Sequence, residues 1–298
     1  MEYRYHTCDV FTRKPFGGNP LAVIPDARGL DAAQMQAIAR EFNYAETTFV
    51  LPAEQGQTRR VRIFTPEREV PFAGHPNIGT AFLLADLGEI AVTEDHADIT
   101  FEELAGRVPI RIERCSDGAI ECELTAPEPL SIGREVDAGT LARAVGLAAD
   151  QVVTRHHFPC VASVGLPFLV AEVADRAALA RATAQLDRLR ELEDAGVTSF
   201  IHLYTRDAGA FDLHARMFAP LTGVPEDPAT GSANSALIAL LGTVAPEPEG
   251  ETRWHIAQGE DMGRPSELFG RVEKAAGEIT EVHMSGSCVR MFDGTFRM

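Results

Sequence analysis

RIFTPEREVP, at residues 62–71, has a partial copy further along the chain in RMFAPLTGVP, at residues 216–225. An arginine, a phenylalanine, two prolines and a valine coincide when the first stretch is shifted by 154 positions. The first stretch leads into GHPNIGTAFLL (74–84) and the second into ATGSANSALIALL (229–241), and both continuations predict a loop that enters a helix. A period this long does not fit a solenoid, so the repeat predicts a duplicated domain with two compact α+β halves.

The predicted elements follow a similar order in the two halves, which we place at 1–127 and 128–298, with the C-terminal segment a candidate to return to the first half. LDAAQMQAIAREF (30–42) predicts a helix with Asp31 as its N-cap. DRAALARATAQLDRLREL (175–192) predicts one helix, and the proline-bearing stretch 126–140 predicts a crossover between the halves. Alternating, β-branched and aromatic residues predict strands at 3–12, 21–24, 43–50, 59–65, 98–104, 107–115, 119–127, 166–173, 197–205 and 212–220.

The composition is that of an ordinary globular protein. The chain has 298 residues, of which 45% are hydrophobic and 24% charged. A net charge of −17 argues against nucleic acid or an anionic membrane as a partner, because like charges repel. The N-terminus has no apolar signal-peptide core, and no apolar run reaches ~18 residues. Five scattered cysteines without a CxxC pair fit reduced thiols, so a cytoplasmic protein is expected.

The two helix starts are candidate anion sites. Gly74-His75-Pro76 opens one predicted helix, and Thr230-Gly231-Ser232 opens the other. The first turn of a helix presents unpaired N–H groups and partial positive charge, and glycine lets a ligand approach the backbone closely. Two such starts facing each other would hold a carboxylate or an enolate. Neither a Walker loop nor a G-x-G-x-x-G fingerprint is present, so phosphate binding is not implied.

Three ionisable residues lie in or near these loops or at a strand start: Glu46, His75 and Asp227. Glu46 heads the apolar strand ETTFV, where a general base or a solvated strand edge would both explain it. A hydrogen bond from His75 to a loop carbonyl would explain that histidine without a catalytic role. Asp227 and Ser232 are likewise explained as turn or cap residues. Their joint placement on matched loops is what favours a site.

Metal binding is not expected. His156 and His157 lie near Cys160, but adjacent residues of a strand point to opposite faces, which does not suit fixed ligand geometry. Three further histidines of the second half, His202, His214 and His255, lie in strand-like stretches and are interpreted as core or surface residues.

Four stretches together resemble the PhzF-like phenazine-biosynthesis family, which is related to diaminopimelate epimerase. They are DVFTRKPFGGNPLAV (9–23), ETTFV (46–50), FTPEREVPFAGHPNIGTA (64–81) and EDPATGSANSAL (226–237). The resemblance extends over nearly the whole chain, with departures at Ala45, where serine is frequent, and at Asn77.

The resemblance implies a duplicated epimerase-like fold in which each half wraps a mostly antiparallel sheet round a central helix, with the active site in the cleft between the halves. It also implies a homodimer that needs no cofactor and no metal. The implied reaction is the isomerisation of trans-2,3-dihydro-3-hydroxyanthranilate, or a related proton transfer on a small carboxylate. The residues that this implies are catalytic Glu46, His75 and Asp227, and substrate-binding Asn19, Gly74, Thr230, Gly231 and Ser232.

Other classes of function stay open at this point. Diaminopimelate epimerase and proline racemase use paired thiols at the two helix starts, and AGHPN and PATGS contain no cysteine, which disfavours a two-thiol racemase. An epimerase or racemase of another amino or hydroxy acid, a non-catalytic ligand-binding relative, and an assembly protein remain as alternatives. For the isomerase, we expect an apolar setting to raise the pKa of Glu46 from its usual ~4.3 toward neutrality.

Overall fold

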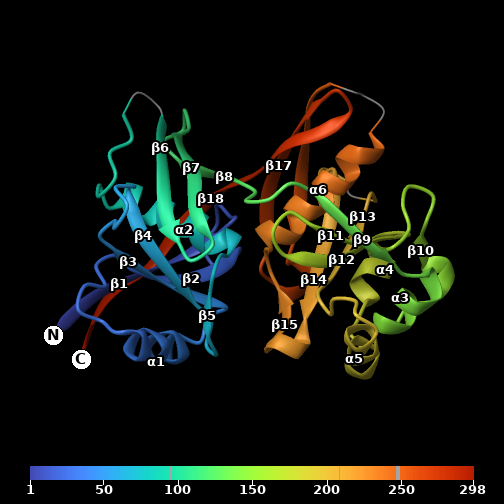
Figure 1. The fold of residues 1–298 in the computed structure, drawn as a ribbon, viewed down its shortest axis with the longest axis horizontal. Coiled ribbons are helices and arrows are strands. Elements are labelled where there is room, and N and C mark those ends of the chain that lie inside the picture. The colour runs from blue at the N-terminus through green and yellow to red at the C-terminus, as the bar shows by residue number, and fades with distance from the viewer. Residues whose placement is uncertain (94–95, 208, 246–248) are drawn as a thin grey trace. The chain divides into compact units, whose positions relative to one another are not determined.

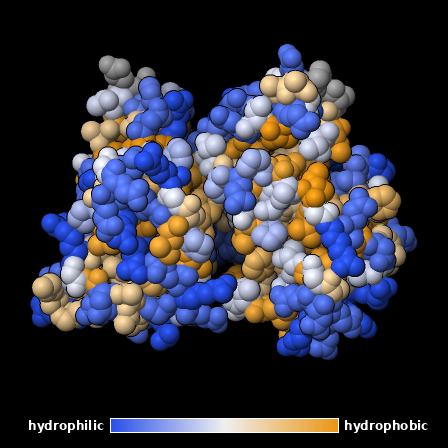
Figure 2. Space-filling model, viewed as in Figure 1, coloured by the Kyte–Doolittle hydropathy of each residue, from blue (hydrophilic) through white to orange (hydrophobic). Residues whose placement is uncertain are grey.

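The computed structural model describes residues 1–93, 96–207, 209–245 and 249–298, and these form two compact units. The first unit consists of Met1–Thr125 and Ser285–Met298, and the second of Ala126–Met284 (Figure 1). Within the described ranges, no helix is both long enough and apolar enough to cross a membrane. Hydrophilic residues cover most of the visible surface of each unit, with hydrophobic residues in smaller groups (Figure 2).

The first unit is a closed, mixed β-barrel. Its strands pair in the order β1, β2, β3, β4, β6, β7, β8, β18 and back to β1, with parallel pairing at β2–β3 and at β4–β6. Closure removes exposed sheet edges. The elements of this unit are β1 (Glu2–Val10), β2 (Asn19–Ile24), α1 (Ala32–Phe42), β3 (Glu46–Leu51), β4 (Arg59–Phe64), β5 (Glu69–Val70), α2 (Gly74–Asp86), β6 (His96–Glu103), β7 (Gly106–Arg114), β8 (Ile120–Thr125) and the later part of β18 (Glu278–Arg297).

Helix α2 fills the barrel. Every residue from Gly74 to Ala85 is buried, and the helix contacts β1, β2, β3, β7 and β8. A helix enclosed on all sides must be apolar all round, which explains the run of alanine, leucine and phenylalanine after residue 80. Gly79 allows the close approach, because a Cβ atom there would lie 2.6 Å from Leu21 Cδ2. The barrel therefore holds the start of α2 in a fixed place.

The second unit has a sheet in the order β9, β11, β12, β13, β14, β16, β17, with parallel pairing at β12–β13 and β14–β16. Helix α6 is buried against β11, β12 and β17. The elements are β9 (Ser131–Glu135), α3 (Ala138–Ala144), η1 (Ala149–Gln151), β10 (Val152–Val153), β11 (Cys160–Ser163), β12 (Pro167–Val173), α4 (Arg176–Arg181), α5 (Leu186–Asp194), β13 (Ile201–Thr205), β14 (Leu213–Ala219), η2 (Pro220–Thr222), β15 (Val224–Asp227), α6 (Gly231–Val244), β16 (Gly250–Gln258), η3 (Glu260–Met262) and β17 (Ser266–Ala275).

The repeated arginine makes two kinds of contact that are common to both units. In the first unit, the Arg62 guanidinium lies 5.1 Å from the Phe64 ring centroid and donates two hydrogen bonds to Glu69. In the second unit, Arg216 lies 4.7 Å from the Phe218 ring centroid and donates two hydrogen bonds to Glu226. A planar guanidinium suits both stacking and paired donation, so lysine would not replace it.

The repeat does not keep one offset throughout. Val70 pairs with Ile63 in the first unit, but the residue that pairs with Met217, which matches Ile63, is Asp227. The offset is therefore 154 up to β14 and 157 after it, and the matched Val70 and Val224 are not structurally equivalent. The 3₁₀ turn η2 lies in the longer connection between β14 and β15.

One prediction in the second half was wrong, and strand β9 was not predicted. The single helix predicted at 175–192 is two helices, α4 and α5, because the backbone N–H groups of Thr183 and Gln185 donate to the end of α3 at Val145 and Ala144. The predicted crossover contains strand β9, all five residues of which are exposed. An exposed edge strand has no alternation between apolar and polar residues, so its sequence gave no strand signal.

Candidate active site

Glu46 and His75 meet in the first unit. Glu46 is the first residue of β3, which pairs in parallel with β2, and His75 is the second residue of the buried helix α2. Glu46 Oε2 and His75 Nε2 are 3.4 Å apart, and their side chains are 19% and 6% exposed. The predicted strand at Glu46 and helix start at His75 are confirmed, and the fold brings these two side chains into contact.

Burial sets the protonation state of His75. Desolvation lowers the pKa of His75 from 6.5 to about 3, so the ring is neutral at neutral pH. Asn19 Nδ2 lies 3.3 Å from His75 Nδ1, and an amide nitrogen only donates, so Nδ1 is the acceptor. The ring proton is then on Nε2, which faces Glu46. The Glu46 carboxylate therefore lies beside a neutral ring and not beside an imidazolium.

The start of α2 has no side-chain cap. Its N-cap residue is Ala73, which offers no hydrogen-bonding side chain to the first turn. Asn77, one turn into the helix, donates from Nδ2 to the Ala73 carbonyl oxygen at 3.0 Å. Gly74 and His75 therefore lie where backbone N–H groups of a helix start can receive an anion.

The second unit builds a similar helix start at α6. The N-cap is Thr230, whose hydroxyl does not cap the helix but donates to the Asp227 carboxylate at the end of β15. Gly231 and Ser232 are the first two residues of the helix, so Ser232 is not the cap. Asp227, Thr230, Gly231 and Ser232 are thus gathered at one place in the second unit.

Gln258, at the end of β16, holds this second helix start. Its amide oxygen accepts from the Thr230 N–H at 3.2 Å and from Asn234 Nδ2 at 2.7 Å. Its amide nitrogen donates to the Asp227 carbonyl oxygen at 2.8 Å and to Thr230 Oγ1 at 3.1 Å. One buried amide therefore fixes the carboxylate-bearing loop and the first turn of α6 together.

His202 was read as a packing residue from the sequence and has a further contact. Its Nε2 lies 3.1 Å from Asn234 Oδ1, and burial lowers the pKa of His202 to about 4. Asn234 in turn donates to the Thr230 carbonyl oxygen at 3.0 Å, as Asn77 does to Ala73. The asparagines and Gln258 were missed by sequence reasoning, although Asn77 and Asn234 each follow a helix-start glycine by three positions.

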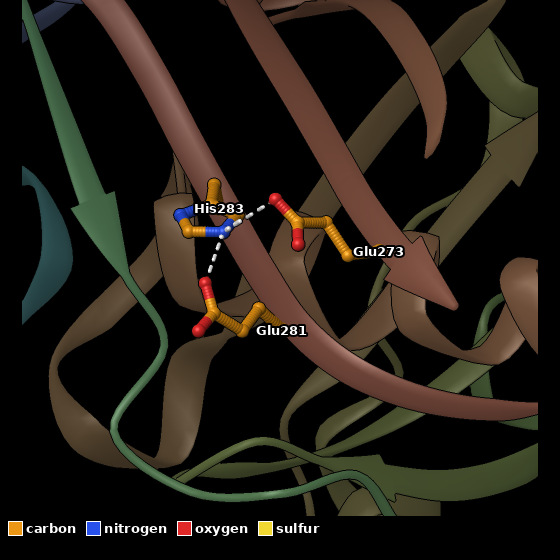
Figure 3. A group of neighbouring side chains, drawn as sticks. All are labelled: Glu273, Glu281 and His283. Atoms are coloured by element: carbon orange, nitrogen blue, oxygen red, sulfur yellow. Dashed lines mark ion pairs between the residues drawn. The ribbon is translucent and has the colours of Figure 1, made fainter. Parts of the chain in front are cut away.

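Several other histidines make ion pairs. His156 and His157 lie in a loop, not in a strand as predicted, and His156 pairs with Glu172 at 2.6 Å. His283 on β18 lies 3.0 Å from Glu281 and 3.9 Å from Glu273 on β17 (Figure 3). Although these three side chains are close enough together to share an ion, Arg271 already pairs with Glu273. An ion-pair cluster accounts for the contacts.

The sequence matches the family model described as phenazine biosynthesis-like protein over residues 8–294. It is 35% identical over 297 residues to the trans-2,3-dihydro-3-hydroxyanthranilate isomerase of Pseudomonas chlororaphis, covering 98% of this chain and 99% of that one. It is 37% identical over 300 residues to an uncharacterised isomerase of Mesorhizobium japonicum, covering 97% of both chains.

Solved structures agree with the sequence match. A predicted epimerase from Pseudomonas aeruginosa is 33% identical, with a TM-score of 0.82 and 99% of both chains covered. A PhzF-family protein of Bacillus anthracis has a TM-score of 0.90 over the full length of both chains, and its 24% identity shows the fold alone. A probable proline racemase from Agrobacterium radiobacter, at 15% identity and a TM-score of 0.65, likewise shares the epimerase-like fold. From its sequence and its fold, the chain belongs to the phenazine biosynthesis-like (PhzF) family of isomerases.

Proposed function

We propose that this isomerase moves a proton between two carbons of a small carboxylate substrate without a cofactor, with Glu46 as the group that carries the proton. The observation that supports this most directly is the contact of Glu46 with a buried, neutral His75 whose N–H faces the carboxylate. A neutral ring at this position does not neutralise the carboxylate as an imidazolium would, which supports a role for Glu46 as a base.

In the proposed step, the Glu46 carboxylate takes a proton from one substrate carbon, and the electron pair of that C–H bond enters the conjugated system. The resulting carboxylic acid returns the proton to another carbon. Atoms and charge balance without a co-reactant, and Glu46 ends as it began. The reaction needs Glu46 to reach two carbons on one face of the substrate.

Backbone N–H groups near Gly74 and Gly231 are proposed to hold the substrate carboxylate and the charge that develops during transfer. Neither helix start is capped by a side chain, which supports this role. We assign Asp227 to proton transfer or hydrogen bonding at the polar groups of the substrate, and Asn19, Thr230 and Ser232 to its binding. Asp227 is 6% exposed and its loop is fixed by Gln258, which suits a positioned group.

The substrate is proposed to be trans-2,3-dihydro-3-hydroxyanthranilate or a related carbon acid. The name of the Pseudomonas chlororaphis relative supports this choice. We further infer that the two units arose by duplication, since each pairs a buried helix with an uncapped start, an arginine stacked on phenylalanine, and an asparagine that bonds to the N-cap carbonyl. The family resemblance leads us to expect a homodimer.

The test is to mix purified protein with trans-2,3-dihydro-3-hydroxyanthranilate and follow the ultraviolet spectrum, comparing wild type with Glu46→Gln. Glutamine keeps the shape of the side chain but cannot carry the proton, so turnover should fall by at least about 10³-fold. Glu41→Gln serves as the matched control, because Glu41 is exposed on α1.

Unchanged turnover in Glu46→Gln would contradict the role of Glu46. If neither protein acts on this substrate, exchange of substrate hydrogen with deuterium oxide across a panel of carboxylates identifies the carbon acid. Exchange by wild type and not by Glu46→Gln supports proton transfer with another substrate. Tight ligand binding with neither exchange nor turnover would contradict an enzyme and favour a binding protein.

A further inference from the structure

A buried network of hydrogen bonds joins His202 of β13 to the Asp227 loop of the second unit. His202 lies beside Asn234, which bonds to Gln258. Gln258 in turn bonds to Thr230, whose hydroxyl reaches Asp227. All five residues are buried. Because a buried donor or acceptor is costly to leave unpaired, the position of each proton in this network can be worked out from the contacts.

Two backbone groups set the orientation of the Gln258 amide. The Thr230 N–H can only donate, so the atom that it meets at 3.2 Å is the amide oxygen. The Asp227 carbonyl oxygen can only accept, so the atom 2.8 Å from it is the amide nitrogen. The second hydrogen of that nitrogen is directed at Thr230 Oγ1, which is 3.1 Å away. The Thr230 hydroxyl therefore accepts from Gln258 and donates its own proton to Asp227 Oδ2.

A backbone group also sets the orientation of the Asn234 amide. Its nitrogen lies 3.0 Å from the Thr230 carbonyl oxygen, and its second hydrogen is directed at the Gln258 amide oxygen, 2.7 Å away. The Asn234 amide oxygen, Oδ1, is left facing His202 Nε2 at 3.1 Å. An acceptor at this place requires an N–H group, so the His202 ring carries its proton on Nε2.

The surroundings of His202 favour a neutral ring. Its Nδ1 is buried without a hydrogen-bond partner among the described residues, so a second proton there would have no acceptor. Its partners on the neighbouring strands are Val170 and Met217, which carry no charge. Burial lowers the pKa of His202 to about 4, in agreement with these contacts. His202 is therefore a fixed donor at neutral pH.

We propose that His202 is a positioning residue of the enzyme, whose Nε2–H sets the direction of this network and so keeps the Thr230 hydroxyl donating to Asp227. A donor fixed on Oδ2 holds the Asp227 carboxylate in one orientation and favours its ionised form. The effect on catalysis rests on the role proposed for Asp227, whereas the direction of the network does not.

A purely structural role for His202 is the simpler explanation, and the first unit argues against it. Asn77 bonds to its N-cap carbonyl oxygen as Asn234 does, yet Asn77 Oδ1 has no hydrogen-bond partner within the described ranges. The residue that matches His202 is Thr48, which bonds to Thr80. A helix start of this kind thus forms without a donor to the amide oxygen of its asparagine, and the donor is present in the unit that holds Asp227.

The first test locates the protons of His202 without an assay of activity. Nitrogen NMR of labelled protein, from about pH 6 to about pH 8, distinguishes the two neutral tautomers and the imidazolium. His202→Gln identifies the signals of this ring. We expect one neutral form, protonated on Nε2, throughout this range. A proton on Nδ1, or an imidazolium at about pH 7, overturns the proposal.

The second test compares kcat/KM on trans-2,3-dihydro-3-hydroxyanthranilate, or on the carbon acid that wild type is found to exchange. His202→Leu removes the donor to Asn234 and should lower kcat/KM by about tenfold, since a buried acceptor is left unpaired and the network loses its fixed direction. His202→Gln keeps an N–H donor and should stay within about threefold of wild type. His255→Leu is the matched control, because His255 is half-buried on β16 and its ring bonds to Glu267.

Equal kcat/KM in wild type and His202→Leu overturns the positioning role. So does an equal loss in His202→Gln and His202→Leu, because the ring and not its donor would then matter. Should His202→Leu fail to fold, Gln258→Glu tests the same network. Its carboxylate offers the Thr230 hydroxyl a second acceptor, so kcat/KM should fall by at least about tenfold, and an unchanged value contradicts the proposal. If wild type acts on no substrate, the proposed function fails while the NMR result still decides the direction of the network.

Discussion

At the scale of single residues, burial decides which groups of the site carry charge. His75 is buried in the first turn of α2, and desolvation favours its neutral form. The pKa of this imidazole falls to about 3. The ring beside Glu46 is therefore uncharged at neutral pH.

The neutral state of His75 has a measurable cost at low pH. Its folded-state pKa lies below the ordinary 6.5, so the unfolded chain binds a proton that the folded chain does not, and stability falls as pH drops from 6.5 toward 3. His75→Gln should lose about 2–3 kcal/mol less than wild type in unfolding free energy between pH 6.5 and 4.5. Urea unfolding at a series of pH values measures this.

His96→Gln is the control for that experiment, because His96 is exposed on β6. His202 is buried and neutral in wild type and in both variants, so the stability lost at low pH because of His202 is the same in all three proteins. Equal pH dependence in wild type and His75→Gln would contradict a neutral His75.

Sequence could identify Glu46 and His75 as candidates, because each interrupts an apolar pattern at the start of an element. It could not identify the contacts of Asn19 or Asn77. Such contacts depend on which strand of the barrel lies beside which turn of α2, and single-residue patterns carry no information about that register.

At the scale of elements, a helix start is held in each unit by an asparagine one turn into the helix. Asn77 bonds to Ala73 in α2, and Asn234 bonds to Thr230 in α6. This leaves the first N–H groups without a side-chain cap, which a structural helix end would normally have. The first turns of α2 and α6 therefore lack a side-chain cap, and an asparagine within each helix stabilises them instead.

Removing Gln258 should show how much this lateral support contributes. Gln258→Leu leaves the Thr230 N–H, the Asn234 amide and the Asp227 carbonyl oxygen buried without their partner, so the free energy of unfolding should fall by about 2–4 kcal/mol. Urea unfolding measures the loss. Gln55→Leu, in an exposed loop, should change it by less than about 0.5 kcal/mol.

The elements that sequence predicted best have strong periodic patterns. The helix at residues 32–42 begins after Asp31, whose side chain accepts from the Gln34 N–H as an N-cap should. The break between α4 and α5 was not predictable, because it depends on bonds to the distant end of α3. Strand β9 was missed because it is exposed throughout.

At the scale of the whole molecule, strand β18 begins in the second unit and completes the barrel of the first. Its later residues pair with β1 from Val10↔Cys288 to Glu2↔Arg297. The first unit therefore contains both ends of the chain, and the Met298 N–H donates to the Met1 carbonyl oxygen at 2.9 Å. The sequence alone did not decide whether the C-terminal segment returns to the first half, because no local pattern specifies which strands pair with each other.

Deletion of residues 285–298 should open the barrel without unfolding the second unit. Amide hydrogen exchange of β1 and β2 should become fast, because β1 loses its partner on one side. The single tryptophan, Trp254, lies on β16 in the second unit, and its fluorescence should stay that of the folded protein. Deletion of residues 297–298 alone is the control, and protection of β1 in the longer deletion would contradict the closing role of β18.

Because β18 is the last strand to be synthesised, the barrel of the first unit can close only at the end of translation. Synthesis runs at roughly 5–20 residues per second, so β1 and β8 emerge early and wait many seconds for the last segment of the chain. During that interval each presents a row of unpaired backbone groups, which is the kind of surface on which nascent chains stick to one another. Every residue of the second unit leaves the ribosome before the barrel can close. The yield of active protein should therefore depend on translation speed and on chaperone access near the end of the message. This dependence should be stronger than for a protein whose first domain is complete before its second is synthesised.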